Sequence, residues 1–557
     1  MVFLLFAFAL TAMIGRLCYL MIVRADHYGV QAKEIQQRER RIKAKRGEIR
    51  DRNGKVLAGN KAVSTISVIH SQVKEPEKVI RILAKELKMD EDQIRRKVEK
   101  VSSREKIKSN VDKKTSDTIR DYGLAGVTVD EDDKRQYPYG SLGSKVLGFT
   151  GADNQGIIGL EVSYEKFLKG IDGAILTTTT AGGVEIENGA EERVEPISGQ
   201  NLTTSLDVTI MQYADQVANQ ILQKKKAKSV DIIVMNPNNG EIYAMACAPE
   251  FDLNSPFEIT GDTASMTAKE KQDLRNQMWR NPCVSDTYEP GSTFKILTSA
   301  AGIEKKVVTM NDHFFCPGYR IVEDRRIRCH KTTGHGSETF LQGIMNSCNP
   351  VFMDVGSRLG VHNFFEELNQ FQLMKRTGID LPGEAATIFH KEDKVGAVEL
   401  ATISFGQSFQ ISPVRLLASC SAIINGGTSV TPHVGVSTAR EDGSYMKKFT
   451  YPGGSRVVSK ETSDQIREAL GKVVSEGTGK NAGVEGYEVG AKTGTSQKLP
   501  RGNGKYIAST LAFAPVSKPE VITLVRIDEP EGTYYGGTVA APVVSQLYTN
   551  LLPYILK

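Results

Sequence analysis

The first residues of the chain constrain its fold more strongly than any other feature. Residues 2–23 are almost entirely apolar, and Arg16 is the single charge among them. Roughly 20 such residues suffice to span a lipid bilayer. A cleaved signal peptide would have a shorter apolar core, a basic start and a small-residue cleavage site, and none of these is evident. We therefore predict an uncleaved transmembrane anchor over residues 1–23.

The rest of the chain is polar and too long for a single core. With 557 residues, at least two folded units are expected. The 71 basic and 66 acidic residues nearly balance, which argues against a nucleic-acid partner. Residues 24–45 are strongly basic and are expected to be helical. The positive-inside rule would place them in the cytoplasm, whereas the motifs described below indicate an extracytoplasmic domain, and we give the motifs more weight.

The first half of the polar region shows mixed α and β signals. Asn53-Gly54, between apolar alternations, predicts a tight hairpin turn. Residues 75–122 follow a helical period. Their expected apolar stripe consists of Ile80, Ile82, Leu83, Leu87 and Ile94. Residues 123–200 are rich in glycine and in short strand signals.

A domain boundary is expected near residues 195–228. The strand signals at 231–235 and 241–245 are joined by the turn Asn238-Asn-Gly240, which predicts a second hairpin. We expect this hairpin to begin an antiparallel sheet with helices on its faces.

The first of three chemical motifs is Ser292-Thr-Phe-Lys295, preceded by the loop residues Pro290 and Gly291. The apolar run that follows predicts a buried helix, on which the serine and the lysine share one face. Burial lowers the pKa of a lysine, so its amine can take the proton of a nearby serine. Alone the pattern is weak, because a helix-capping serine and a surface lysine would produce it too.

The second motif is Ser347-Cys348-Asn349, which follows a helical pattern. In a loop, a hydroxyl and an amide two residues apart can point into one cleft. Ser347 would relay a proton to a leaving amine, and Asn349 would hold the substrate amide or Lys295. Such a triplet is common in turns and carries little weight alone.

The third motif, Lys492-Thr-Gly-Thr495, reads as a strand. Lys492 offers a cation, and Thr493 or Thr495 a hydroxyl, for a substrate carboxylate. Gly494 would let a substrate backbone approach the strand edge closely. The backbone N–H groups of Thr495 and Ser292 would form an oxyanion hole. On its own the pattern is also typical of an ordinary strand end.

The order of the three motifs is more specific than any one of them. The same set marks class A β-lactamases and penicillin-binding proteins. From about residue 40 to its end, the chain resembles a class B penicillin-binding protein. The resemblance also rests on Arg46-Gly-Glu-Ile-Arg-Asp-Arg-Asn-Gly54, Arg135-Gln-Tyr-Pro138, Gly159-Leu-Glu161, Tyr288-Glu-Pro-Gly291, Ser404-Phe-Gly-Gln407 and Asn425-Gly-Gly427.

This resemblance implies an α/β (α+β) chain with three parts. They are a transmembrane helix over 1–23, an elongated α+β pedestal over 24–195, and a serine-transpeptidase domain of the penicillin-binding and β-lactamase-like fold over 196–557. It implies a single-pass protein of the cell membrane whose catalytic domain lies on the extracytoplasmic side. Ser292 would be acylated by the D-Ala-D-Ala end of a peptidoglycan stem peptide, D-Ala would leave, and an amine of a neighbouring stem would take the acyl group.

The resemblance also implies partners. β-Lactams would acylate Ser292, a lipid-II polymerase would work beside the chain in the membrane, and acyl transfer would need no cofactor. Within the family, Cys348 and Cys329 resemble the sporulation-specific members that build the spore cortex. Those members often carry an additional small carboxy-terminal domain, of which this sequence gives no sign. A sporulation role and an elongation or division role therefore both stay open.

A cysteine and histidine cluster surrounds the second motif. In one interpretation Cys316, Cys329 and His330 hold a structural Zn²⁺, with Asp286 as the preferred fourth ligand over His335. In another, an oxidising exterior forms a disulfide between Cys329 and Cys348, which would displace the second motif and switch the enzyme off. A third is that these are small buried residues without a special bond.

Several competing functions use some of the same residues. A β-lactamase would need a positioned glutamate, and Glu366-Glu-Leu-Asn369 fits an amphipathic helix face better. A D,D-carboxypeptidase would use the same three motifs, although the pedestal disfavours it. A β-lactam sensor would need several membrane helices and an output domain. A catalytically silent scaffold would be expected to have lost a motif, and all three are intact.

Overall fold

The computed structural model describes residues 1–28, 37–102, 104–178 and 192–556. They form two compact units, each assembled from separate chain segments. The first unit contains Met1–Gly47, Gly59–Gln136 and Lys166–Gln200, and the second contains Glu48–Ala58, Tyr137–Glu165 and Asn201–Lys557. The chain therefore passes between the units more than once, and the linear boundary expected after residue 195 stays a prediction.

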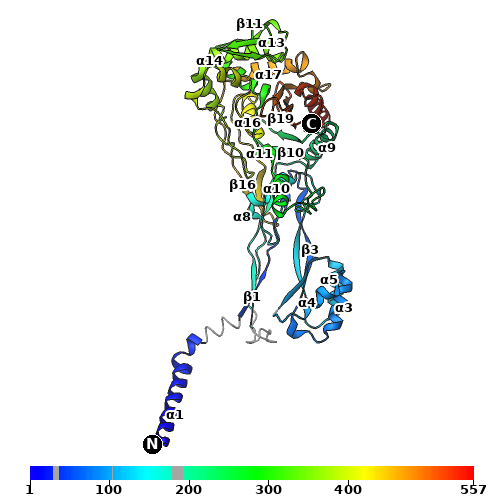
Figure 1. The fold of residues 1–557 in the computed structure, drawn as a ribbon, viewed down its shortest axis with the longest axis vertical. Coiled ribbons are helices and arrows are strands. Elements are labelled where there is room, and N and C mark those ends of the chain that lie inside the picture. Colours follow the sequence, from blue (N-terminus) through cyan, green and yellow to red (C-terminus); the bar gives the residue numbers. More distant parts are fainter. Residues whose placement is uncertain (29–36, 103, 179–191, 557) are drawn as a thin grey trace. The chain divides into compact units, whose positions relative to one another are not determined.

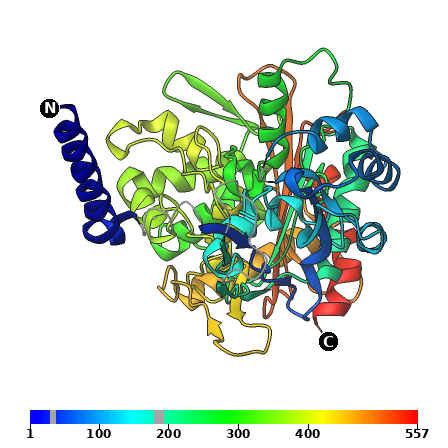
Figure 2. The same cartoon turned by 90° about the horizontal axis from the view of Figure 1, so that it is seen from below.

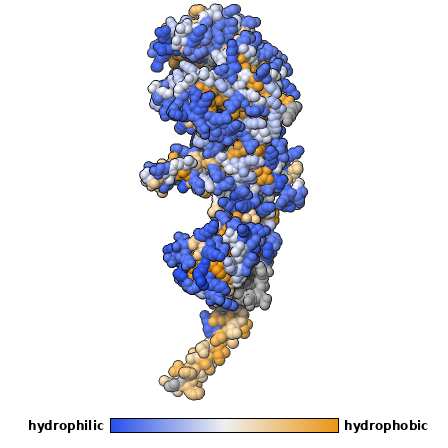
Figure 3. All heavy atoms as spheres, turned by 90° about the vertical axis from the view of Figure 1, so that its right-hand side faces the viewer, coloured by the Kyte–Doolittle hydropathy of each residue, from blue (hydrophilic) through white to orange (hydrophobic). Residues whose placement is uncertain are grey.

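The amino-terminal segment is helical. Helix α1 (Val2–Cys18) continues into a π-helical turn, η1 (Tyr19–Val23). Phe3–Val23 has a mean hydropathy of 1.9, and Figure 3 shows this helix as an almost continuous hydrophobic surface. Within the described part of the chain, it is the one helix that is long and apolar enough to cross a membrane.

The basic stretch after this helix differs from the expectation. Gln37–Ile42 forms strand β1, which pairs antiparallel with β6 (Gly173–Thr178), and β7 (Glu192–Val194) completes this three-stranded sheet. The predicted helix over residues 24–45 is therefore wrong for residues 37–42, because pairing with a neighbouring strand outweighs the helix preference of Gln, Arg and Glu. Residues 29–36 lie outside the described residues.

The first unit also contains a small α and β core. Helices α3 (Pro76–Leu87), α4 (Glu91–Val98) and α5 (Lys113–Asp121) accompany strands β4 (Glu105–Val111) and β5 (Val127–Gln136) and most of β3 (Val56–Val68), whose first three residues belong to the second unit. In the predicted stripe Ile80, Leu83, Leu87 and Ile94 are buried, whereas Ile82 is half-buried. The helical expectation is wrong for residues 105–111. These residues form strand β4, which pairs with β3 and buries the side chains of Ile107 and Val111.

The predicted hairpin at Asn53-Gly54 is confirmed. It joins β2 (Ile49–Arg50) to β3, and Gly54 has a φ of +84°. One carboxylate oxygen of Asp51 accepts the backbone N–H groups of Asn53 and Lys55, each at 2.8 Å. The side chain of a buried aspartate therefore stabilises the turn through hydrogen bonds to its backbone.

The second unit is built on a five-stranded antiparallel sheet in the order β10-β9-β19-β18-β17. Its strands are β9 (Ser229–Met235), β10 (Ile242–Ala248), β17 (Gly490–Gln497), β18 (Tyr506–Ala514) and β19 (Val521–Asp528). The predicted hairpin of β9 and β10 forms one edge, and β17 forms the other. An edge strand keeps one side of its backbone free for another chain.

Helices flank this sheet, as predicted. Helices α9 (Val208–Lys225) and α19 (Ala541–Ile555) lie side by side against it (Figures 1 and 2). A second group contains α12 (Lys295–Glu304), α16 (Pro413–Ile424) and α17 (Lys460–Ser475), and α12 packs on α14 (Asn349–Gln370). The three motifs lie at the start of α12, at the start of α14 and on β17.

Candidate active site

The first motif forms a tight turn that leads into a buried helix. Residues Gly291–Phe294 make a 3₁₀ turn, η3, which runs directly into α12. Ser292 is half-buried, and Lys295 is only 1% exposed. Gly291 has a φ of +56°, and a Cβ there would come within 2.9 Å of the Thr495 carbonyl oxygen. The turn is therefore pressed against β17, and only glycine fits at its first position.

Lys295 connects the first motif to the second. Its Nζ lies 2.7 Å from the carbonyl oxygen of Ser347, 3.3 Å from the Ser347 Oγ and 2.8 Å from the Asn349 Oδ1. Burial lowers the pKa of Lys295 to about 8, although the thiols of Cys348 and Cys329 oppose this shift. A lysine with this pKa can carry or release a proton near neutral pH.

The second motif occupies a strained junction between two helices. Helix α13 (Phe340–Met345) ends just before Ser347, and Asn349 is the first residue of α14. Ser347 is 6% exposed and has a φ of +53°, a left-handed conformation that non-glycine residues rarely adopt. The surrounding packing holds this conformation and aims the Ser347 hydroxyl at both lysines of the motifs.

The third motif brings a second buried amine to the same hydroxyl. Lys492 is fully buried on β17, and its Nζ donates to the Ser347 Oγ at 2.8 Å and to the Thr493 carbonyl oxygen at 3.3 Å. Burial lowers the pKa of Lys492 well below its ordinary value, and the positive charge of Lys295 adds to the effect. The two amines therefore converge on one oxygen.

The glycine of the third motif makes a close internal contact. A Cβ on Gly494 would come within 2.7 Å of the Ser509 Oγ and 3.0 Å of the Pro290 carbonyl oxygen. Gly494 thus allows β17 to pack against the turn that carries Ser292. The flanking Thr493 is 8% exposed, while Thr495 is half-buried and its Oγ1 accepts the backbone N–H of Gly536 at 3.0 Å.

Two further features support the serine turn, and sequence reasoning assigned neither of them a role. The Nη2 of Arg501 donates to both carboxylate oxygens of Glu289, at 2.8 and 2.9 Å, and the backbone N–H of Ser408 donates to the same carboxylate at 3.0 Å. A Cβ on Gly406 would lie 2.0 Å from the Gly291 carbonyl oxygen. Glu289 and Gly406 both lie in segments that carried the family resemblance, whereas Arg501 had no such signal.

Comparison with known proteins agrees with this geometry. Residues 231–549 match the penicillin-binding protein transpeptidase domain, and residues 41–204 match the penicillin-binding protein dimerisation domain. The chain belongs to the class B penicillin-binding proteins. It is 39% identical to stage V sporulation protein D of Bacillus subtilis, over 97% of this chain and 82% of that protein.

More distant penicillin-binding proteins also match along nearly the whole chain. The probable peptidoglycan D,D-transpeptidase PenA of Neisseria meningitidis is 29% identical, over 95% of this chain and 88% of its own length. Penicillin-binding protein 3 of Mycobacterium tuberculosis, solved with aztreonam, aligns with a TM-score of 0.69 at 24% identity, over 92% of this chain and 97% of that one. The expected α/β fold is thereby confirmed.

The cysteine cluster of this penicillin-binding protein differs in membership from the expectation. The ligand atoms of Cys316, Cys329, Cys348 and His335 all lie within 4.8 Å of one another. Asp286, expected as a ligand, instead forms an ion pair with Arg280. A lone aspartate six residues before Ser292 gave no information on which way its side chain would point.

The histidine assignment also changes. The Nδ1 of His330 is 3.8 Å from the Cys329 Sγ, but this residue is exposed and is not among the four that converge. The side chain of His335 is 8% exposed, and its Nδ1 is 3.7 Å from the same sulfur. All seven cysteines are free, including Cys329 and Cys348, which one of the three interpretations joined in a disulfide.

Proposed function

We propose that this penicillin-binding protein is a peptidoglycan D,D-transpeptidase in which Ser292 is the nucleophile. The observation that carries the proposal is the convergence of two buried amines, Lys295 and Lys492, on the hydroxyl of Ser347. Lys295 itself follows Ser292 by one helical turn. Three separate segments supply these groups, and burial lowers the pKa of both amines.

In the acylation step, Lys295 in its neutral form takes the proton of the Ser292 hydroxyl. The Ser292 Oγ then bonds to the carbonyl carbon of the penultimate D-Ala of a stem peptide. The backbone N–H groups of Ser292 and Thr495 would stabilise the oxyanion. The closeness of Gly291 to the Thr495 carbonyl oxygen supports this arrangement, because it keeps the turn and β17 in contact.

The leaving group needs a proton, and Ser347 is placed to give one. Its Oγ accepts hydrogen bonds from Lys295 and Lys492, so its own proton is left to point toward the substrate. When the C–N bond breaks, this proton would pass to the departing D-Ala amine and be replaced from a lysine. An acceptor amine from a neighbouring stem then attacks the acyl-enzyme and reverses these proton transfers.

Substrate binding would use the free edge of β17. The terminal carboxylate of the stem peptide would contact the hydroxyls of Thr493 and Thr495 and the amine of Lys492. Asn349 would hold a substrate amide in addition to its hydrogen bond from Lys295. β-Lactams would acylate Ser292 by the same route, and the transfer itself requires no cofactor.

The cellular setting is also proposed. Helix α1 and η1 would anchor the chain in the cell membrane, with residues 24–195 as a pedestal and residues 196–557 as the transpeptidase domain on the extracytoplasmic side. A lipid-II polymerase would act beside it in the membrane. The near full-length similarity to a stage V sporulation protein supports a role in spore formation over elongation or division.

Labelling with a fluorescent penicillin tests the nucleophile. The full-length chain in detergent is expected to be labelled covalently, and Ser292→Ala is expected to lose the label. Ser421→Ala is a suitable control, because Ser421 is buried and its hydroxyl has no hydrogen-bond partner among the described residues. Label that persists in Ser292→Ala would rule out this nucleophile.

A D,D-carboxypeptidase would show the same labelling, so the products must be separated. The purified chain is incubated with a pentapeptide donor and an added D-amino acid or stem-peptide amine. A transpeptidase yields the exchanged or cross-linked peptide, whereas a carboxypeptidase yields only the tetrapeptide. Hydrolysis alone at saturating acceptor would contradict the transpeptidase assignment.

A further inference from the structure

The hairpin of strands β12 (Tyr319–Val322) and β13 (Arg325–Arg328) is strongly basic. Residues 319–331 contain five basic and two acidic side chains, a formal charge of +3, whereas the whole chain of 557 residues carries only +5. The basic residues are Arg320, Arg325, Arg326, Arg328 and Lys331. Such a concentration of charge is either a solvated surface or a binding face for an anion, and the contacts of each arginine distinguish the two.

The two faces of this hairpin carry different side chains. The antiparallel register places Tyr319 opposite Arg328 and Ile321 opposite Arg326. Opposed residues share a face, and successive residues of a strand alternate between faces. These four side chains therefore form one face, which we call the outer face. The other face, the inner face, consists of Arg320, Val322, Arg325 and Ile327.

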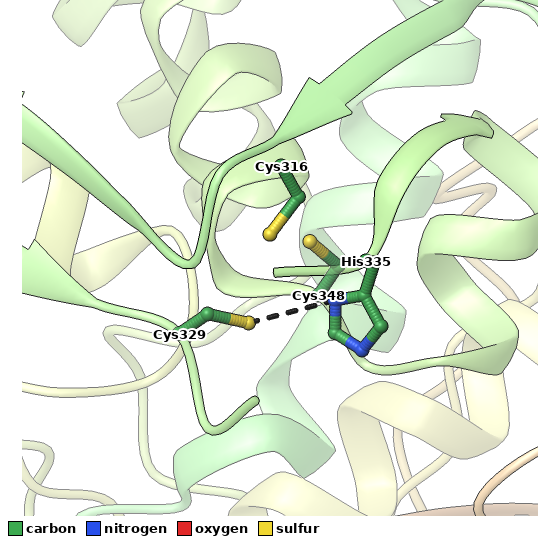
Figure 4. Close-up of side chains that lie close together, drawn as sticks. All are labelled: Cys316, Cys329, His335 and Cys348. Carbon is green, nitrogen blue, oxygen red and sulfur yellow. Dashed lines mark hydrogen bonds between the residues drawn. The ribbon is translucent and has the colours of Figure 1, made fainter. Parts of the chain in front are cut away.

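The inner face is directed toward the rest of the second unit. Arg320 forms an ion pair with Asp354 of α14, to which its Nε donates at 3.0 Å. Cys329 extends the inner face, because its backbone N–H donates to the Gly318 carbonyl oxygen at 2.8 Å and adds one pair to the ladder. Figure 4 shows its sulfur pointing toward the cysteine and histidine cluster. Its neighbour Arg328 therefore points the other way and is exposed.

The outer face presents two arginines without acidic partners. Arg326 and Arg328 are exposed, and neither pairs with a carboxylate in the part of the chain that the structure describes. The guanidinium of Arg326 lies over the ring of Tyr319, 3.8 Å from its centroid. Stacking on an aromatic ring orders a guanidinium and leaves its N–H edge free to donate. Ile321 is 66% exposed and adds apolar surface beside these groups.

A second basic hairpin of this unit provides a contrast. The connection between β17 and β18 carries Lys498, Arg501 and Lys505, and each has an acidic partner. The Nζ atoms of both lysines contact the Glu529 carboxylate, at 2.6 and 2.8 Å, and Arg501 pairs with Glu289. The cations of that hairpin therefore stabilise the fold, whereas those of the outer face remain available to a ligand.

One side chain connects the basic hairpin to the active site. The Nδ2 of Asn349 donates to the Arg328 carbonyl oxygen at 3.1 Å, and its Oδ1 accepts from the Lys295 Nζ at 2.8 Å. In the proposed function, Asn349 also holds an amide of the donor stem peptide. The part of the stem that precedes this amide would therefore leave the site beside Arg328.

We propose that Arg326 and Arg328 on the outer face bind a carboxylate of the donor stem peptide upstream of its D-Ala-D-Ala end, an inference that rests on the proposed function. The terminal carboxylate is assigned to Lys492, Thr493 and Thr495, so any further carboxylate of an acidic stem needs a cation of its own. Arginine suits this role, because its planar fork of donors matches a carboxylate. The hairpin would thus favour acidic stem peptides over those whose carboxylate is amidated.

Binding of two matched peptides tests the outer face. Both end in D-Ala-D-Ala, and they differ only in a Glu or a Gln at the second residue before that dipeptide. Full-length Ser292→Ala in detergent prevents turnover, and dissociation constants are measured by ligand-observed NMR. We expect the Glu peptide to bind about threefold or more tightly than the Gln peptide, within the range of exposed ion pairs. In about 0.5 M salt the difference should shrink, because exposed charges are screened.

Charge removal on each face separates a binding face from a diffuse positive field. In the Ser292→Ala background, Arg326→Gln and Arg328→Gln should each reduce the preference for the Glu peptide, and together they should abolish it. Arg325→Gln is the matched control, since it removes the same charge from the inner face of the same hairpin and should keep the preference. The three arginine side chains are exposed, so the Tm should stay near that of the parent chain.

Four results would overturn the proposal. The first is equal binding of the two peptides by Ser292→Ala, and the second is a preference that survives loss of both outer-face arginines. The third is an equal reduction by Arg325→Gln and Arg328→Gln, which would indicate a diffuse field. The fourth is binding of glycerol phosphate that depends on Arg326 and Arg328 while the two peptides bind equally, which would assign the face to a phosphate ligand instead.

Penicillin labelling separates this proposal from the proposed function. A chain that is labelled at Ser292, but whose Ser292→Ala variant binds both peptides equally, would contradict the carboxylate site alone. A chain that is never labelled at Ser292, but whose Ser292→Ala variant prefers the Glu peptide through Arg326 and Arg328, would contradict the transpeptidase assignment and leave the carboxylate site intact.

Discussion

The Nζ of Lys492 lies 2.8 Å from the Oγ of Ser347, and the Nζ of Lys295 approaches the same oxygen from a different element at 3.3 Å. Two buried ammonium groups so close together would repel each other strongly. Burial lowers the pKa of both amines, which favours their neutral forms and so reduces this repulsion. Ser347 therefore bridges two amines that can exchange a proton through its hydroxyl.

Ser347→Ala is expected to slow acylation by a fluorescent penicillin by about 10²- to 10⁴-fold, the usual range for loss of a proton-transfer group. The side chain is small and buried, so the fold should survive. The measurement is the second-order rate constant of labelling, with Ser421→Ala as the matched control. A rate within twofold of wild type would show that Ser347 does not relay a proton.

The acylation rate is expected to rise with pH and to level off above about pH 8. Burial lowers the pKa of Lys295 to about 8, while Cys348, Cys329, Glu338 and Cys316 oppose the shift. Lys295 acts as a base only when neutral, and at pH 7 about a tenth of the molecules have it in that form. The reactive fraction therefore grows as pH increases through the pKa.

The measurement is the labelling rate from pH 6 to pH 9.5 with a penicillin that does not titrate in this range. Lys295→Arg serves as a variant whose side chain stays charged throughout, so it should be slow at every pH. A rate that falls as pH rises from 6 to 8 would contradict Lys295 as the general base.

Gly494→Ala is expected to impair both stability and acylation. The added methyl would meet the Ser509 Oγ at 2.7 Å and the Pro290 carbonyl oxygen at 3.0 Å, which forces β17 away from the Ser292 turn. Overpacking of this kind costs about 1–3 kcal/mol. We expect a lower Tm and labelling slowed at least tenfold.

Gly471→Ala is the matched control for this change. Gly471 lies in the middle of α17, and its added methyl would meet Val516 at an ordinary distance of 3.4 Å. Alanine is also the better helix former. Its Tm and labelling rate should equal or exceed those of wild type. If Gly494→Ala behaved in the same way, close packing of β17 on the serine turn would not matter for function.

The parts of the fold predicted from the sequence are those that depend on local pattern. The hairpins at Asn53-Gly54 and of β9 with β10 follow from turn residues between apolar runs. The helix after Ser292 follows from its apolar run. Strand β1 was missed because its Gln, Arg and Glu residues have a helical preference, and only its distant partner β6 makes it a strand.

The site was predictable to a similar extent. The order of the motifs located Ser292, Lys295, Ser347 and Lys492, because each lies in a short recognisable pattern. The membership of the cysteine and histidine cluster depends on where loops cross, and His335 instead of His330 joins it because the His335 ring turns inward. Sequence spacing does not contain that information, and the same holds for Arg501, which lies in a loop far along the chain from Glu289.

Arg501→Ala is expected to loosen the serine turn. The Glu289 carboxylate is 8% exposed and depends on Arg501 and the Ser408 backbone N–H for its charge balance. Removing the arginine leaves a buried carboxylate with one partner. Because the arginine side chain is itself 38% exposed, we expect a stability loss of only about 1–2 kcal/mol. The larger effect should be on labelling, since Glu289 directly precedes the Pro290-Gly291-Ser292 turn.

Two variants make this prediction specific. Arg501→Lys keeps the charge but places it on a shorter side chain with a different shape, so its labelling rate should fall between those of wild type and Arg501→Ala. Arg358→Ala removes a more exposed ion pair, with Asp312, and should lower stability by less than about 1 kcal/mol without affecting labelling. Thermal unfolding and labelling rates are measured for all three. If the ion pair positions the Ser292 turn, its loss must slow the attack by Ser292. Equal labelling rates for Arg501→Ala and Arg358→Ala would therefore mean that the ion pair at Glu289 contributes to folding alone.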